Sequence, residues 1–125
     1  MLSDRPLFAT IPATDIDRAK RFYSDRLGMK VTRETPGGVE FESGSTRFLV
    51  FPTGSPRGEH TLASWLVDDI EREVAELRKK GIVFEEYHFP GLETVHGIAI
   101  IEGQERAAWF KDSEGNILAL GEPLP

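Results

Sequence analysis

The sequence contains no cysteine. Disulfide bridges, thiol nucleophiles, thiolate zinc sites and iron–sulfur clusters are therefore excluded, and a reducing cytoplasm is the expected compartment. Long apolar runs are also missing, because runs such as Ile98 to Ile101 are far shorter than the roughly 20 residues that cross a bilayer. The N-terminal residues MLSDRPLF lack the basic and apolar regions of a signal peptide. We therefore expect a soluble, cytoplasmic protein that binds no membrane.

The chain also lacks an excess of positive charge. Its net charge is −6, and its 15 Lys and Arg residues are scattered among 21 Asp and Glu residues. This pattern argues against binding to nucleic acid or to anionic membranes. The sequence contains no phosphate-binding loop, dinucleotide fingerprint or nucleophile elbow. Small molecules or other proteins are the expected partners, and the acidic balance favours a cationic ligand slightly.

Two amphipathic helices are the clearest features that are present. The first is predicted to begin after Thr14, its expected N-cap, with apolar residues recurring from Ile16 to Leu27. The second is predicted to begin after Asp68 as N-cap, with an apolar stripe from Ile70 to Leu77 and basic residues in its last turn. A glycine follows each helix, as is common at helix C-termini.

The helices alternate with predicted strands in a repeated order. Strands are expected at 7–12, 29–35, 39–42, 46–51, 61–67, 82–87, 106–111 and 116–120. The chain of 125 residues then reads as one domain: module one at 7–52, a linker at 53–60 and module two at 61–122. TDIDR at 14–18 aligns with DDIER at 68–72 at an offset of 54 (69 − 15). We therefore predict two copies of one β-α-β-β-β unit.

A long insertion at 89–104 interrupts the second module. It contains Pro90-Gly91 and Gly97, which favour turns. Connections of this length are often functional, so closure over a ligand is one interpretation. A surface loop that covers a sheet edge is the other, and the sequence leaves both open.

Five motifs in a fixed order point to a family. They are DIDR at 15–18, FY at 22–23, LGM at 27–29, VDDI at 67–70 and DSEGNIL at 112–118. Together they resemble the vicinal oxygen chelate superfamily, which includes glyoxalase I, extradiol dioxygenases, fosfomycin-resistance enzymes and bleomycin-resistance proteins. The resemblance implies an α+β fold with two tandem βαβββ modules, a U-shaped open barrel with helices outside, and a homodimer.

The resemblance also implies where a metal ion would bind. Catalytic members hold a divalent metal through His, Gln or Glu side chains on the first and last strands of each module, and the metal accepts two substrate oxygens. The matching positions here are Phe8, Val50, Leu62 and Ala119, the last standing where the family's D-x-x-G-N-x-L-E-L motif has its glutamate. None of these side chains binds a metal. We therefore expect no metal and no cofactor there, and no catalytic residue is identified.

Three histidines leave an alternative metal site open. His60 with Glu59 is one combination, and His88 with Glu93 and His96 is another. Neither shows a ligand spacing typical of metal sites.

The alternation of side chains along the strands predicts an apolar cleft. Its lining is expected to comprise Phe8, Thr10, Phe48, Val50, Leu62, Ser64, Ile117 and Ala119, together with Trp109. Tyr87 and Phe89 lie on segments that reach the same region, whereas Ala9, Trp65 and Val67 should face the helices. Such a lining suits a planar or hydrophobic ligand.

Three functions remain after these exclusions. We expect a metal-independent protein that binds an apolar or aromatic small molecule, with a cationic one favoured by the acidic balance, as bleomycin-resistance-type proteins sequester their ligands. The alternatives are a glyoxalase-like lyase or dioxygenase with a relocated divalent metal site, and a structural or regulatory dimer whose cleft is filled by its own side chains.

Overall fold

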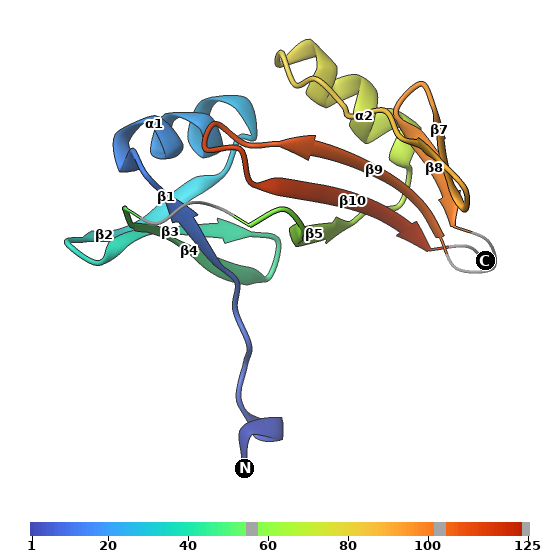
Figure 1. Ribbon diagram of the computed structural model, residues 1–125. Coiled ribbons are helices and arrows are strands. Elements are labelled where there is room, and N and C mark those ends of the chain that lie inside the picture. The colour runs from blue at the N-terminus through green and yellow to red at the C-terminus, as the bar shows by residue number, and fades with distance from the viewer. Residues whose placement is uncertain (55–57, 102–104, 124–125) are drawn as a thin grey trace. The chain divides into compact units, whose positions relative to one another are not determined.

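The computed structural model describes residues 1–54, 58–101 and 105–123. The chain forms two compact units, Met1–Arg57 and Gly58–Pro125, and each contains one sheet and one α-helix (Figure 1). The expected α+β class is confirmed. Residues 55–57 of the predicted linker and 102–104 of the predicted insertion lie outside the described part. No helix in the described ranges is long and apolar enough to cross a membrane.

The first unit has the predicted β-α-β-β-β order. Its elements are the 3₁₀ turn η1 (Leu2–Asp4), β1 (Thr10–Ala13), α1 (Ile16–Arg21), the π-helical turn η2 (Phe22–Arg26), β2 (Lys30–Thr35), β3 (Gly38–Ser43) and β4 (Thr46–Pro52). The sheet order is β1-β4-β3-β2, with β1 parallel to β4 and the other pairs antiparallel. Tyr23 is fully buried and anchors the helical segment on the sheet, with its ring 5.6 Å from the rings of Phe41 and Phe48.

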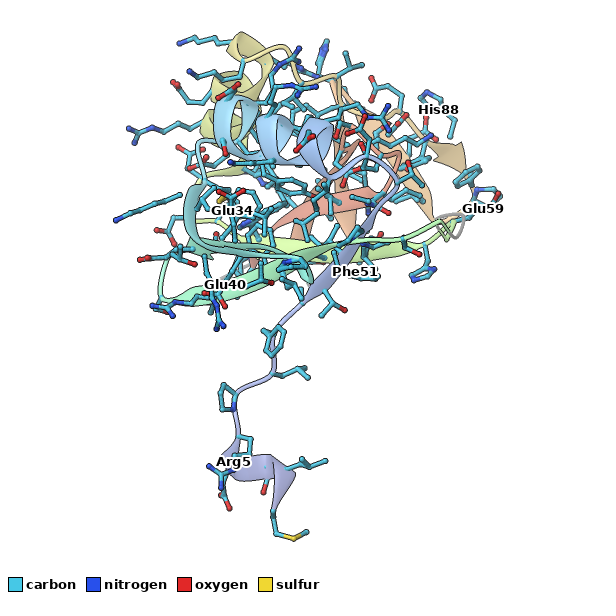
Figure 2. The ribbon with its side chains drawn as sticks, turned by 90° about the vertical axis from the view of Figure 1, so that its left-hand side faces the viewer. Arg5, Glu34, Glu40, Phe51, Glu59 and His88 are labelled. Atoms are coloured by element: carbon cyan, nitrogen blue, oxygen red, sulfur yellow. The ribbon has the colours of Figure 1, made fainter. Side chains whose placement is uncertain are left out.

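The chain before β1 extends away from the first sheet. Leu7 is 98% exposed and Phe8 is 59% exposed, so the predicted strand at 7–12 begins three residues late, at Thr10. Figure 2 shows Arg5 in this extension, well away from the strands.

The second unit contains the same elements with additional strands. They are β5 (Thr61–Leu66), α2 (Ile70–Lys79), β6 (His88–Phe89), β7 (Leu92–Val95), β8 (Ile98–Ile101), β9 (Glu105–Lys111) and β10 (Ile117–Pro123). The sheet order is β5-β10-β9-β8-β7-β6, with β5 parallel to β10. Ile70 and Val74 of α2 are buried, and on the sheet Phe110 contacts Trp65 and Phe84, with ring centroids 6.1 Å and 5.5 Å apart.

One strand prediction for module two is wrong, and the insertion whose role the sequence leaves open forms strands. The pattern at 82–87 predicts a strand, but these residues pair with the sheet through a single bridge, Phe84 to Phe110. The predicted insertion instead supplies β7 and β8, which extend the sheet beside β9. The turns that allow this contain Gly91 and Gly97, both with positive φ. Strand pairing between distant segments therefore overrides the local pattern.

The helix caps lie one residue later than predicted. Asp15, not Thr14, caps α1 by accepting a 3.0 Å hydrogen bond from the Arg18 backbone N–H. Asp69, not Asp68, caps α2 in the same way, with Arg72 as the donor at 3.2 Å. Both carboxylates also lie at the positive end of a helix dipole.

A charged network joins the start of α2 to the sheet. Glu122 of β10 accepts a 2.9 Å hydrogen bond from the Ile70 N–H and two 3.1 Å hydrogen bonds from the Arg106 guanidinium. Arg106 also contacts Glu71 at 2.8 Å. The hydrogen bond to Glu71, followed by that to Glu122, raises the pKa of Arg106. Glu122 therefore satisfies an N–H at the helix start that has no intrahelical acceptor.

Candidate functional site

Each sheet has one face covered by its own helix and one face that we call the helix-free face. On the helix-free face of the second sheet, Ser64, Ala119 and Trp109 form one row across β5, β10 and β9. Ser64 is exposed, Trp109 is half-buried and Ala119 is 5% exposed. Ile117 follows the same alternation two residues before Ala119. Four of the predicted lining residues thus share one face of this unit.

Leu62 is a special case on the same strand. The register between β5 and β10 shifts there, because Ile117 pairs with Thr61 and Leu118 pairs with Ala63. Leu62 is the extra residue of this bulge and is half-buried. Alternation alone does not assign a face to a bulged residue.

An aromatic cluster borders this row. The Tyr87 ring meets the Trp109 indole edge-on at 5.4 Å and stacks on Phe89 at 5.7 Å. The chain is held there because the Thr94 N–H donates to the Tyr87 carbonyl at 2.9 Å and the Tyr87 N–H donates to the Thr94 hydroxyl at 2.8 Å. Burial, and secondarily Glu85, raises the pKa of Tyr87, so this phenol stays neutral at physiological pH. No local spacing in the sequence signals this three-ring cluster.

Small side chains occupy the neighbouring row. Ala99, Ala107 and Gly121 align across β8, β9 and β10. A side chain at Gly121 would meet the Glu105 carboxylate, since a Cβ built there lies 2.7 Å from its Oε2. Ala99 and Ala107 are 1% and 3% exposed and Gly121 is buried, so this row offers little accessible surface. The accessible residues of the face beside the aromatic cluster are exposed Ser64 and half-buried Trp109, where a flat molecule could stack.

The hairpin between β9 and β10 holds Trp109 and Ala119 opposite each other. At its turn Asp112 is buried, and its Oδ1 accepts hydrogen bonds from the Glu114 and Asn116 N–H groups, both at 2.9 Å. The Asn116 side-chain amide donates to the other carboxylate oxygen at 2.9 Å. The turn residues act as scaffold, and the two strands that they join carry the candidate site.

In the first unit the faces differ from the prediction. Thr10 pairs with Leu49, whereas Val50 pairs with Ile11 and is fully buried. Phe48 shares the face of Val50 and contacts Tyr23 of η2. The expectation that Phe48 and Val50 share a face with Thr10 is therefore wrong, because both fill the core beneath the helical segment.

The helix-free face of the first sheet carries other residues. Leu49 and Phe51 are half-buried there, beside Thr10 and Pro12 of β1. Figure 2 labels Phe51 and Glu40 on this sheet. Phe8 lies before β1, two residues from Thr10, and is largely exposed. A role for Phe8 and Thr10 in ligand binding stays a prediction.

The register between β1 and β4 reassigns one of the four metal-ligand positions inferred from the sequence. Ile11 and Trp65 are equivalent at the repeat offset of 54 (65 − 11), and their partners in the adjacent strands are Val50 and Leu120. Ala119 therefore corresponds to Leu49 and not to Val50. The exchange of one apolar residue for another leaves all four positions without a metal-binding side chain.

The histidines occupy separate surroundings. His60 is exposed, His88 contacts the Glu93 carboxylate at 2.8 Å, and His96 has φ of 53° and an exposed side chain. Among the described residues, no three His, Cys, Asp or Glu side chains come together as a metal site would require.

The comparisons with known proteins agree on the fold. The crystal structure of a glyoxalase family protein from Enterococcus faecalis is similar with a TM-score of 0.76 and 21% identity, covering 98% of this chain and 100% of that one. A lactoylglutathione lyase from Agrobacterium tumefaciens gives 0.63 and 22%, with 94% and 93% coverage. TnmS3, an antibiotic binding protein from a Streptomyces species, gives 0.64 and 22%, with the same coverage. No curated protein matches the sequence.

A family model matches almost the whole chain. The match runs over residues 5–120 and includes both βαβββ repeats and the closing hairpin. Solved glyoxalase-family structures share the fold. The chain belongs to the Glyoxalase/Bleomycin resistance protein/Dioxygenase superfamily.

Proposed function

We propose that this protein binds a planar, largely apolar small molecule without a metal ion, on the helix-free face of the second sheet. The observation that carries the proposal is the aromatic border of Trp109, Tyr87 and Phe89 beside the small residues Ser64 and Ala119. Aromatic rings that stand beside small side chains favour stacking with a flat ligand.

The side chains at the inferred metal positions distinguish between a binding protein and a metal-dependent enzyme. Phe8, Leu49, Leu62 and Ala119 offer neither a nitrogen nor an oxygen donor in their side chains. Similar structures include both a lyase and an antibiotic binding protein at 22% identity, so the fold does not choose between them. The side chains at these positions favour the binding protein. A cytoplasmic homodimer is part of the same proposal.

A single-tryptophan variant provides a direct test. Trp65 stacks on Phe110 on the helix-bearing face, so Trp65→Phe leaves Trp109 as the only indole reporter. Metal-free bleomycin and a panel of planar aromatic or cationic natural products would be titrated while Trp109 fluorescence and thermal stability are followed. We expect saturable quenching and a rise in Tm.

Two further variants make the test specific. Ser64→Tyr fills the exposed end of the row next to Ala119 and should abolish quenching, whereas Glu76→Tyr on the exposed side of α2 should leave it intact. Equal affinity in both variants, or no binding across the panel, contradicts the proposal. Stoichiometric Ni, Zn, Fe or Mn in the purified protein, lost on His60→Ala, would favour a relocated metal site instead.

A further inference from the structure

A cavity lies in the second unit, away from the helix-free face. It measures about 840 Å³ and is bounded by α2 on one side and by β7, β8 and their turns on the other. Figure 1 shows β7 and β8 beside α2. Arg106 lines this groove and contacts Glu71 of α2, which places the groove on the helix-bearing face of the sheet. Its volume is within the range of about 300 to 1,000 Å³ that small-molecule sites occupy.

Aliphatic side chains form half of the groove's lining. Val74 and Ala75 come from α2, and Leu92, Val95, Ile98 and Ile100 come from β7 and β8. Ile100 is 69% exposed and Val95 is 66% exposed, so two large apolar side chains border an accessible cavity. Exposed aliphatic surface of this kind is typical of a binding groove. Among the described residues no Phe, Tyr or Trp lines it, in contrast to the helix-free face.

The charged side chains around the groove differ in whether they have an ion-pair partner. Arg106 forms ion pairs with Glu71 and Glu122. Glu93 forms a 2.8 Å hydrogen bond with His88, which is an ion pair only when the imidazole is protonated. Arg78 forms no ion pair within the described residues, although Glu86 lies close enough for its pKa to be affected by Arg78. The lining therefore presents one cation that is not neutralised by direct contact with a carboxylate.

Arg78 is held in a defined position. Its Nη2 donates to the His96 carbonyl at 3.0 Å, and its guanidinium lies 5.6 Å from the centre of the Phe84 ring. Gly97 permits this approach, because a Cβ at that position would lie 3.0 Å from Arg78 Nη2. One donor is used by His96, and the remaining guanidinium donors have no acceptor in the part of the chain that the structure describes. A guanidinium with free donors suits a carboxylate, which it can bind through two parallel hydrogen bonds.

We propose that this groove binds an amphipathic carboxylate, such as a medium-chain fatty acid, with its carboxylate at Arg78 and its alkyl chain along Val74, Ile98 and Ile100. The groove thus differs from the helix-free face both in location and in ligand chemistry: an aliphatic anion instead of a flat ring system. An unpaired cation at one end of an aliphatic surface is the complement of such a molecule.

Sodium decanoate, below its micelle concentration, is the probe for this site, and decyltrimethylammonium is the control with the same chain and the opposite charge. Chemical-shift changes in ¹H–¹⁵N spectra of the full chain should map to Ala75, Ile98 and their neighbours with decanoate only. Arg78→Gln should weaken decanoate binding by about tenfold or more, since a charge-assisted hydrogen-bonded pair is lost. Arg72→Gln removes the same charge from an exposed position of α2 outside the groove and should change the affinity less than about twofold.

Ile100→Glu is a second variant for the case in which Arg78→Gln disturbs the turn at His96. Ile100 is exposed, so this variant should fold, and its carboxylate should exclude decanoate. Equal binding of the two surfactants, or unchanged affinity in Arg78→Gln, would overturn the proposal. If Ile100→Glu instead converts a dimer into a monomer in sedimentation, the groove is an interface between copies and the ligand site is refuted. These outcomes test the groove independently of the proposed function. They would be the same if no planar ligand bound at Trp109.

Discussion

The Tyr87 ring meets the Trp109 indole edge-on, with 5.4 Å between ring centroids and 78° between ring planes. The two residues come from different segments of the second unit, since Trp109 lies in β9 and Tyr87 precedes β6. This contact connects the segment that follows α2 to the face that we propose binds the ligand. It also shows that a candidate site can be assembled by pairs of residues that no sequence motif joins.

The first prediction concerns the strength of this ring contact. A double-mutant cycle with Trp109→Leu and Tyr87→Leu should give a coupling free energy of about 0.5–1.5 kcal/mol, as edge-to-face pairs do beyond the apolar area that they bury. Urea denaturation of the wild type, the two single variants and the double variant measures this coupling free energy. Additive effects, with no coupling, would show that the rings do not interact in solution.

The second prediction concerns the turn that connects β9 and β10. Asp112→Ala should lower the free energy of unfolding by about 2–4 kcal/mol, because the N–H groups of Glu114 and Asn116 lose their acceptor in a buried turn. Ser113→Ala, one residue later, is the matched control and should change stability by less than about 0.5 kcal/mol. A loss of similar size in both variants would argue against the role assigned to Asp112.

The third prediction uses two glycines with similar backbone conformations. Gly97 has φ of 81° and Gly91 has φ of 84°, so an alanine at either position is strained. Only at Gly97 would the added Cβ also crowd Arg78 Nη2 and the Phe84 Cβ, both at 3.0 Å. Gly97→Ala should therefore lower Tm more than Gly91→Ala, as differential scanning calorimetry can measure. Equal shifts would mean that the turn relaxes away from α2.

The fourth prediction concerns pH. A hydrogen bond from the Thr94 side chain, followed by one from the Gly97 N–H at 2.7 Å, lowers the pKa of Glu86 below its ordinary value of 4.5. The folded state thus favours the carboxylate more than the unfolded state does. This stabilisation is present above the unfolded pKa and is lost as pH falls through the folded pKa.

The measurement compares two proteins across acidic pH. Between about pH 5 and pH 3 the Tm of the wild type should decline more steeply than that of Glu86→Gln, which has no carboxyl group to titrate at this position. Glu85→Gln is the control, because Glu85 is the neighbouring carboxylate and forms an ion pair with Lys111. Parallel declines in wild type and Glu86→Gln would contradict the assignment.

Local chemistry in the sequence is sufficient for the overall organisation. It predicts the order of elements in the first unit, the two helices and the hairpin turn at 112–116, because capping carboxylates, glycines and apolar periodicity act over a few residues. The five sequence motifs also identify the family correctly. The predicted helix caps differ from the observed ones by one residue, since two adjacent polar residues precede each helix and either can cap it.

Features that depend on distant pairing are not determined locally. Alternation shows that Phe48 and Val50 share a face, but the register against β1 decides that this face is buried under Tyr23.

The strands formed by residues 88–101, the ring pair of Tyr87 with Trp109, and the groove at Arg78 likewise arise from contacts between separate segments. The sequence by itself therefore determined most of the elements that form and which side chains alternate together. Only the tertiary structure decided which face each set occupies, because that choice is made by the neighbouring strand or helix and not by the residues along the strand.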